Sequence, residues 1–245
     1  MKTLKLALAL FAFTALTSSV FAQNADEIIS KYITKIGGAD KLNAIKAIKM
    51  EMSVNAQGRE IPVEMVQMRG GKMYLKLNLE GTEMTQMASD GNTIWMTNFM
   101  TMKPEKVDAE TTENAKLSHQ DFPDALLDYK SKGYSAEFVG KETRDGKECC
   151  KVKFTKKPIT IAGTKVDDIT FYYFDTATNF VVATESEIKG GPAKGEKSIA
   201  TMGDYKEVDG LYFPFAMNQG GQDLKISKIT LNPTIDEKAF AFPTE

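Results

Sequence analysis

The sequence predicts a mainly β protein with a small amount of helix, built as one strongly curved antiparallel sheet. Hydrophobic and polar residues alternate with a period of two along most of the chain, and glycine-containing turns separate the alternating runs. A clear helical period of 3.6 residues occurs only near the start. Because a long antiparallel meander must hide its edges, we expect the sheet to curl and the N-terminal helix to cover its concave face.

The first predicted helix covers residues 24–37. Asn24 and Glu27 have the spacing of a capping box, and a Gly-Gly pair after the helix provides a left-handed stop. The apolar stripe of this helix consists of Ile28, Ile29, Tyr32, Ile33 and Ile36. A shorter helical piece is expected over residues 40–47.

Hairpins follow one another from Ile48 to about residue 101, with turns at Gly58, at Gly70-Gly71 and at Gly91. The polar stretch 103–120 is expected to be a long mobile loop, and residues 121–130 a second short helix. Seven more strands are predicted near residues 134–143, 148–156, 165–174, 180–189, 196–207, 211–218 and 222–232. About twelve strands without a linker or repeat favour a single domain over residues 23–245.

Residues 1–22 have the three parts of a cleavable signal peptide. Lys2 and Lys5 precede an uncharged apolar run, and Val20-Phe21-Ala22 fits a small-residue cleavage site. The apolar run is too short for the roughly 20 residues that cross a membrane, and no later stretch is long and apolar enough. Gln23 follows the cleavage site where a lipid-anchored precursor would have Cys. We therefore expect a periplasmic protein with no stable membrane span.

Composition limits the partners. Without Lys2 and Lys5 the chain has 29 basic and 33 acidic residues, so the net charge of the mature region is near −4. Nucleic acids and anionic membrane surfaces favour clustered positive charge, and no basic stripe is present, so neither is expected as the main partner. Cys149 and Cys150 are neighbours in a predicted strand. Their side chains should point to opposite faces, which favours one buried and one exposed thiol over a vicinal or intermolecular disulfide.

The sequence contains no recognisable catalytic constellation. One histidine, His119, cannot build a His-rich metal site, and we interpret it as a solvated loop side chain. Ser118 is not part of a G-x-S-x-G motif. Asp167 and Asp168 are adjacent in a strand and cannot face each other across a substrate. We expect no metal, no cofactor and no enzymatic activity.

Methionine is concentrated in the first half of the chain, where period-two alternation places several methionines on a face shared with Ile, Val and Leu. Methionine is unbranched and polarizable, so it adapts to ligands of variable shape. Ordinary core packing explains each methionine taken singly, whereas the set is consistent with an adaptable acyl-chain cavity. The residues predicted to line that cavity are Met50, Met52, Met65, Met73, Leu75, Leu77, Trp95, Met96, Ile29 and Ile33.

Several segments resemble the periplasmic lipoprotein carriers of the LolA/LolB type, and more closely the outer membrane lipoprotein-sorting homologues of Bacteroidetes-like bacteria. The resemblance is carried by residues 25–50, 138–154, 171–185, 203–215 and 229–243. It implies an incomplete antiparallel barrel of about eleven strands, with helices as a lid over an apolar cavity. The carriers of this family depend on an arginine near the early strands. Arg59 and Arg69 are the early candidates here, and neither is assigned a role.

The leading hypothesis is a monomeric, non-enzymatic carrier that binds lipoprotein acyl chains or another lipid and shuttles it toward the outer membrane. The alternative is an envelope interaction module with a filled core, which binds a partner protein such as a peptidase. A third hypothesis is an enzyme that uses the same cavity together with His119.

Overall fold

The computed structural model describes residues 25–56 and 58–243. The predicted signal peptide, residues 1–22, and the predicted capping residue Asn24 lie outside the described residues. Within the described part of the chain, no helix has the length and apolar character needed to cross a membrane.

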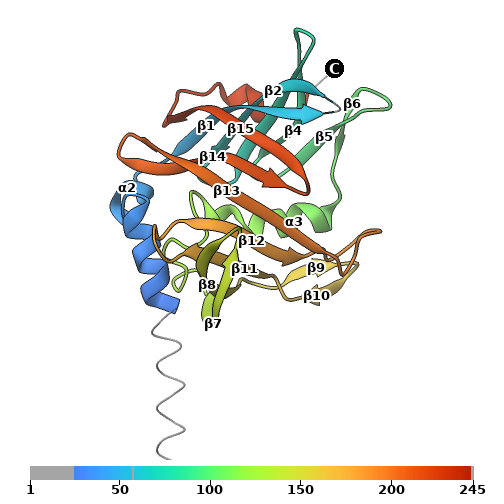
Figure 1. Ribbon diagram of the computed structural model, residues 1–245. Coiled ribbons are helices and arrows are strands. Elements are labelled where there is room, and N and C mark those ends of the chain that lie inside the picture. The colour runs from blue at the N-terminus through green and yellow to red at the C-terminus, as the bar shows by residue number, and fades with distance from the viewer. Residues whose placement is uncertain (1–24, 57, 244–245) are drawn as a thin grey trace, which may run out of the picture.

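One 13-stranded antiparallel sheet forms most of the molecule, in the order β6-β5-β4-β3-β2-β1-β15-β14-β13-β12-β11-β8-β7 (Figure 1). Its strands are β1 (Ala47–Ala56), β2 (Arg59–Met68), β3 (Lys72–Leu79), β4 (Thr82–Asp90), β5 (Ile94–Asn98), β6 (Lys103–Lys106), β7 (Ser135–Arg144), β8 (Lys147–Thr155), β11 (Ile169–Asp175), β12 (Val181–Glu187), β13 (Lys197–Val208), β14 (Leu211–Gln219) and β15 (Gln222–Leu231). The end strands β6 and β7 do not pair with each other, so the sheet stays open. The predicted mainly β fold with one curved antiparallel sheet is confirmed.

The described strands are more numerous than predicted. β6 falls in the segment expected to be a loop, and the strand expected over 165–174 is divided into β10 (Thr164–Val166) and β11. β10 pairs with β9 (Ile159–Ile161) in a separate two-stranded sheet. This small sheet interrupts the connection between β8 and β11, which are neighbours in the large sheet.

Four β-bulges among the described strands help to bend the sheet. Gln86 in β4, Val139 in β7, Val182 in β12 and Ser227 in β15 are each an extra residue at a point where the strand register shifts. A bulge bends its strand and increases the local twist. The bulges therefore give a physical cause for the curvature that the alternating pattern alone cannot specify.

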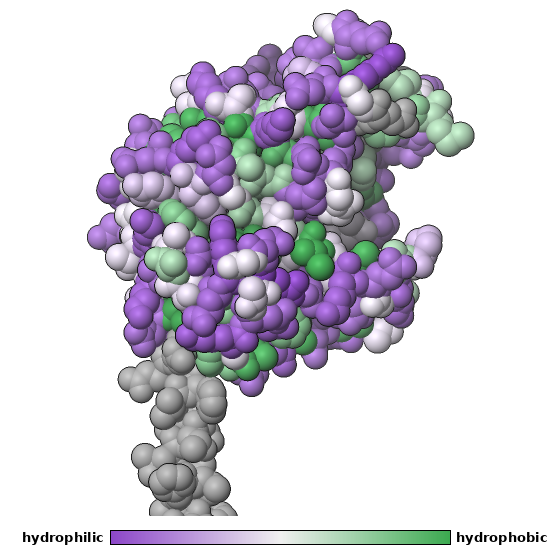
Figure 2. Space-filling view, in the orientation of Figure 1, coloured by the Kyte–Doolittle hydropathy of each residue, from purple (hydrophilic) through white to green (hydrophobic). Residues whose placement is uncertain are grey.

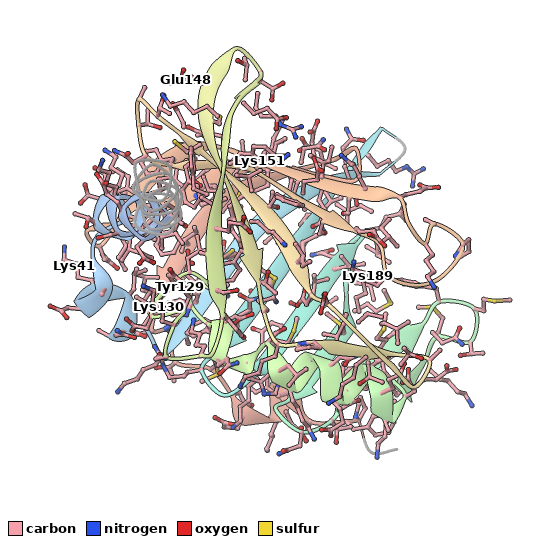
Figure 3. The ribbon with its side chains drawn as sticks, turned by 90° about the horizontal axis from the view of Figure 1, so that it is seen from below. Lys41, Tyr129, Lys130, Glu148, Lys151 and Lys189 are labelled. Atoms are coloured by element: carbon pink, nitrogen blue, oxygen red, sulfur yellow. The ribbon has the colours of Figure 1, made fainter. Side chains whose placement is uncertain are left out.

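The N-terminal helix occupies residues 25–35 of the described chain and is followed by α2 (Ala39–Asn43). It buries its predicted apolar stripe in a core cluster that contains Phe154, Phe174 and Ile48. We call the sheet face that carries this cluster the inner face. Asp26 fixes the start of the helix, because its carboxylate accepts hydrogen bonds from the Tyr129 hydroxyl and the Lys130 ammonium group. Figure 3 shows these two residues together, close to α2.

The second short helix exists, but not where the sequence placed it. It is α3 (Ala109–Leu117), inside the expected loop 103–120, and Asp108 caps it by accepting from the Thr111 amide at 2.8 Å. The helix buries none of its own residues, so it has no apolar stripe that a pattern search could find. The segment 121–130 forms turns after the 3₁₀ helix η1 (His119–Asp121).

Turn chemistry explains why residues 121–130 do not form a helix. The Asp124 side chain accepts from the Leu126 amide at 2.7 Å, which is an Asx turn that competes with helical hydrogen bonding. Asp128 has a φ of 50°, a left-handed conformation that interrupts an α-helix.

The cysteines point to opposite faces of their strand, as the alternation predicts, but Cys150 is half-buried and not the exposed thiol that was expected. Cys149 is buried beside Tyr173 and Ala183 on the face opposite the helix, whereas Cys150 packs at the border of the inner-face core. Both thiols are free.

Candidate functional site

The inner face is covered in one half and bare in the other. Where the N-terminal helix does not reach, strands β1 to β4 and β14 to β15 form an apolar groove of about 480 Å³. It is lined by Met50, Met52, Val54, Ile61, Val63, Met65, Leu75, Leu77, Gln86, Met217, Gln219, Gln222, Leu224 and Ile226. Eleven of these side chains are apolar and three are glutamines. The volume is in the usual range for small-molecule sites, roughly 300–1,000 Å³.

Strand register explains how residues far apart in the sequence meet in the groove. Cross-strand pairing aligns Met50 with Met65, Met65 with Leu75, and Leu75 with Met87. The next row contains Met52, Val63 and Leu77. Because side chains alternate between faces, these rows all point to the inner side. The structure thus brings together five of the residues predicted from the sequence: Met50, Met52, Met65, Leu75 and Leu77.

Trp95 does not belong to this groove, which corrects the sequence prediction. It lies on the outer face, 4% exposed, in a cluster with Tyr74 and Phe240. The C-terminal 3₁₀ helix η2 (Glu237–Phe240) covers that cluster. Met96, the next residue of β5, pairs with Met87 and is 41% exposed. It does not line the groove.

Ile29 and Ile33 lie elsewhere as well. Ile29 is 3% exposed and belongs to the core beneath the helix, and Ile33 packs against that core. Both border an open depression between the helix and residues 126–131, not the groove. The space under the N-terminal helix is therefore occupied by side chains, and the cavity expected there is displaced to the uncovered half of the sheet.

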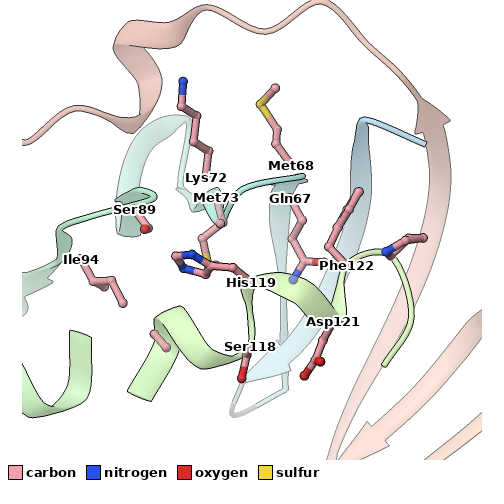
Figure 4. A pocket seen from close by; sticks show the side chains of 13 residues that line it. Gln67, Met68, Lys72, Met73, Ser89, Ile94, Ser118, His119, Asp121 and Phe122 are labelled. Carbon is pink, nitrogen blue, oxygen red and sulfur yellow. The ribbon is translucent and has the colours of Figure 1, made fainter. Parts of the chain in front are cut away.

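A second pocket, of about 440 Å³, adjoins the same face and contains the predicted residue Met73 (Figure 4). Its floor is one cross-strand row, in which Gln67 pairs with Met73, Met73 with Ser89, and Ser89 with Ile94. Its roof comes from the end of α3, from η1 and from Phe122-Pro123. We call it the roofed pocket. No local pattern predicts this pocket, because its floor and its roof are far apart in the sequence.

His119 is part of this roof, which corrects its interpretation as a solvated loop residue. Its imidazole lies over Gly71 and beside Met73 in the pocket (Figure 4). Burial, with a smaller contribution from the Lys116 charge, holds the pKa of His119 below its ordinary value. The imidazole is therefore neutral at neutral pH.

A network of charged and polar groups holds the roof in place. The Asp121 carboxylate accepts from the Tyr134 hydroxyl at 2.8 Å and pairs with Lys156 at 3.2 Å. Lys156 also pairs with Asp168 at 3.1 Å, so the roof is connected to the start of β11. Arg69 donates to the backbone oxygens of Asn43 and Ile45, at 3.1 and 3.0 Å, and its guanidinium lies 5.8 Å from the Phe122 ring centroid. Arg59 forms an exposed ion pair with Glu80.

An apolar surface is also exposed at the turn between β5 and β6. Phe99, Met100 and Met102 are exposed there, Met100 to 95%. Figure 2 shows hydrophobic residues at this projecting corner and a hollow below it in the same side of the molecule. Within residues 25–56 and 58–243, no group of His, Cys, Asp or Glu side chains is arranged to hold a metal ion.

Fold and groove together define a half-open β protein with an apolar inner face, and solved structures share this fold. A DUF1329 family protein from Desulfovibrio piger is similar with a TM-score of 0.54 at 13% identity, covering 89% of this chain and 97% of that one. A LolA superfamily protein from Nitrosomonas europaea gives a TM-score of 0.52 at 12% identity, covering 90% and 97%. No protein-family model and no curated protein matches the sequence. The resemblance inferred from the sequence is confirmed at the level of the fold.

Proposed function

We propose that the protein is an exported periplasmic carrier, a single domain over residues 23–245, that binds the acyl chain of a lipid or lipoprotein in the inner-face groove and carries it toward the outer membrane. The observation that carries the proposal is the groove itself. A sheet face of methionine, leucine, valine and isoleucine is left uncovered by the helices, although it is continuous with the core. The shared LolA-superfamily fold supports the same function.

The lining suits a hydrocarbon chain. No charged side chain among the described residues lines the groove, so nothing in it favours an ionic ligand. Each methylene transferred from water into such a site contributes about 0.8 kcal/mol. The methionines at positions 50, 52, 65 and 217 supply flexible, polarizable walls that adjust to chains of different length or branching. Binding and release of a lipid in this groove need no catalytic step.

A fluorescent acyl-chain probe with an uncharged end group, such as the methyl ester of a labelled fatty acid, tests this proposal directly. We expect the purified chain to bind the probe and Leu77→Glu to weaken binding at least about tenfold, because a carboxylate in the groove must be desolvated. Val139→Glu is the matched control, since Val139 is half exposed at a β7 bulge away from the groove. Equal binding by both variants would rule out the groove as the acyl site, and no binding by the wild-type chain would rule out the function.

A second candidate function, binding of a partner protein, is favoured by the exposed apolar β5–β6 turn. Isolated exposed apolar residues are common, but three within four positions form a small patch. If this candidate function is right, a delipidated sample retains one stoichiometric protein partner, and Met100→Ser releases it. If Met100→Ser retains the partner, the turn is not the binding surface.

A further inference from the structure

We propose that the roofed pocket binds the carbonyl end of the acyl ligand, as an uncharged ester or amide, while the hydrocarbon chain lies in the groove. This inference rests on the proposed function, and it assigns a direction to the bound ligand. It makes the roofed pocket and the groove two parts of one binding site.

The two cavities are consecutive along the same strands. Met73 on the pocket floor and Leu75 in the groove are two residues apart on β3, and so face the same side. Gln67 and Met65 have the same relationship on β2. Two residues of a strand span about 7 Å. A chain that starts in the roofed pocket can therefore continue over Leu75 and Leu77 without leaving the apolar face.

The pocket end of this tract has hydrogen-bond donors of its own, in addition to the three glutamines that line the groove. Gln67 and His119 have side-chain groups in the pocket with no hydrogen-bond partner among the described residues. Ser89 is 2% exposed, and its hydroxyl oxygen accepts from the Gly91 amide at 3.1 Å, which leaves the hydroxyl proton available for donation. An amide, an imidazole and a hydroxyl suit a carbonyl oxygen, which only accepts.

The charged residues at the pocket are already paired with others. Lys72 forms an ion pair with Glu237, and its ammonium group points away from the pocket in Figure 4. Asp121 is engaged by Tyr134 and Lys156. With the His119 imidazole neutral, no unpaired cation among the described residues lines the pocket to compensate a carboxylate or phosphate. Because burial of an uncompensated charge is costly, the pocket favours an uncharged end group.

Ligands with one hydrocarbon chain and different end groups test the inference. Monopalmitoyl glycerol has an ester carbonyl, palmitoyl ethanolamide has an amide carbonyl, and hexadecyl glycerol is the ether that lacks the carbonyl. We expect the wild-type chain to bind the ester or the amide about five- to tenfold more tightly than the ether. Tighter binding of the ester indicates a glycerolipid ligand, and tighter binding of the amide indicates an N-acylated ligand. A preference for either one over the ether supports the proposal that the pocket binds a carbonyl group.

The variants Gln67→Leu and His119→Phe should lose this preference, whereas Val139→Glu, away from both cavities, should keep it. Cooperative urea unfolding shows that each variant is folded. Equal affinity of the wild-type chain for ester, amide and ether would overturn the pocket assignment and leave the groove intact. Tighter binding of palmitate than of the ester would overturn the choice of an uncharged end group. Failure of all these ligands to bind would instead contradict the proposed function.

Discussion

The imidazole of His119 lies directly against Gly71, the second glycine of the β2–β3 turn, so closely that a Cβ on Gly71 would come 2.2 Å from its Nε2. The preceding residue, Gly70, has nearly the same backbone conformation, with φ of +89° against +85°, but open space where its Cβ would lie. The contact joins the floor of the roofed pocket to its roof, and only glycine leaves room for the ring.

This contact predicts a difference between two alanine variants. Gly70→Ala and Gly71→Ala both place a side chain in the left-handed region, at a cost of about 1 kcal/mol each. Gly71→Ala must also displace His119, so its loss of unfolding free energy in urea should be larger. In a His119→Ala background the two substitutions should lower the unfolding free energy by the same amount. If the difference persists in that background, the ring contact is not its cause.

The position of Trp95 predicts what its fluorescence reports. Its indole Nε1 donates to the Phe240 backbone oxygen at 3.5 Å, and the Phe242 ring centroid is 6.2 Å away. Phe240→Ala should therefore shift Trp95 emission to the red and cost about 3–5 kcal/mol of stability. An acyl ligand in the groove should leave the emission unchanged, because Trp95 is on the other face. A ligand-induced shift of similar size would contradict this placement.

A partly buried carboxyl group predicts a pH dependence of stability. Asp124 accepts from the Tyr32 hydroxyl of the N-terminal helix at 2.7 Å. Burial raises the pKa of Asp124, and Asp121 adds to the effect, against the hydrogen bonds from Tyr32 and Leu126 and the charge of Lys132. The folded state then binds the proton more tightly than the unfolded state. The contribution of Asp124 to stability should fall as pH rises above about 4.

The variant Asp124→Asn isolates that contribution. The difference in unfolding free energy between the variant and the wild type should change in favour of the variant as pH increases toward neutral. Urea unfolding at a series of pH values measures it. A difference that does not vary with pH would show that Asp124 has an ordinary pKa.

An ion-pair cluster on the outer face predicts a stabilising role for Glu185. Its carboxylate is 5% exposed, with Lys197 at 2.8 Å and Arg144 at 2.9 Å. These hydrogen bonds lower the pKa of Glu185 against the opposing effect of burial. Glu185→Gln should destabilise the protein by about 1–3 kcal/mol at neutral pH, because the neighbouring charges lose their partner.

Glu187 is the control on the same strand. It is more exposed and pairs with Lys189 at 3.5 Å, so Glu187→Gln should change stability by less than about 0.5 kcal/mol. Equal losses of stability in the two variants would mean that the Glu185 cluster stabilises the protein no more than a surface ion pair does.

Local pattern was enough to predict most of the strands, and it places one face of β3 along the groove. In β3, residues 73, 75 and 77 alternate with polar neighbours, and the structure places these three side chains on the inner face. Alternation along the strand also places Trp95 and Met96 on opposite faces of the sheet, but the sequence does not show which of the two faces inward. That depends on η2, which comes from the far end of the chain to cover Trp95.

The roofed pocket was not predictable for the same reason. His119 is polar, near the end of a helix without an apolar stripe, and nothing in its neighbourhood in sequence indicates that it packs on Gly71. The helix predicted over 121–130, from Pro123 in its first turn and the apolar residues near 126–129, is also absent, because an Asx hydrogen bond at Asp124 replaces the helical one. Long-range packing and side-chain turn chemistry thus determined what local periodicity could not.

Native mass spectrometry of the full-length chain, exported and purified from the periplasmic fraction without detergent, tests the central claim most directly. The account predicts one acyl-bearing molecule bound per protein molecule, which is lost in Leu77→Glu and retained in Val139→Glu. A protein that remains in the cytoplasm, or that is recovered without lipid and takes up none when acyl lipids are added, would contradict it.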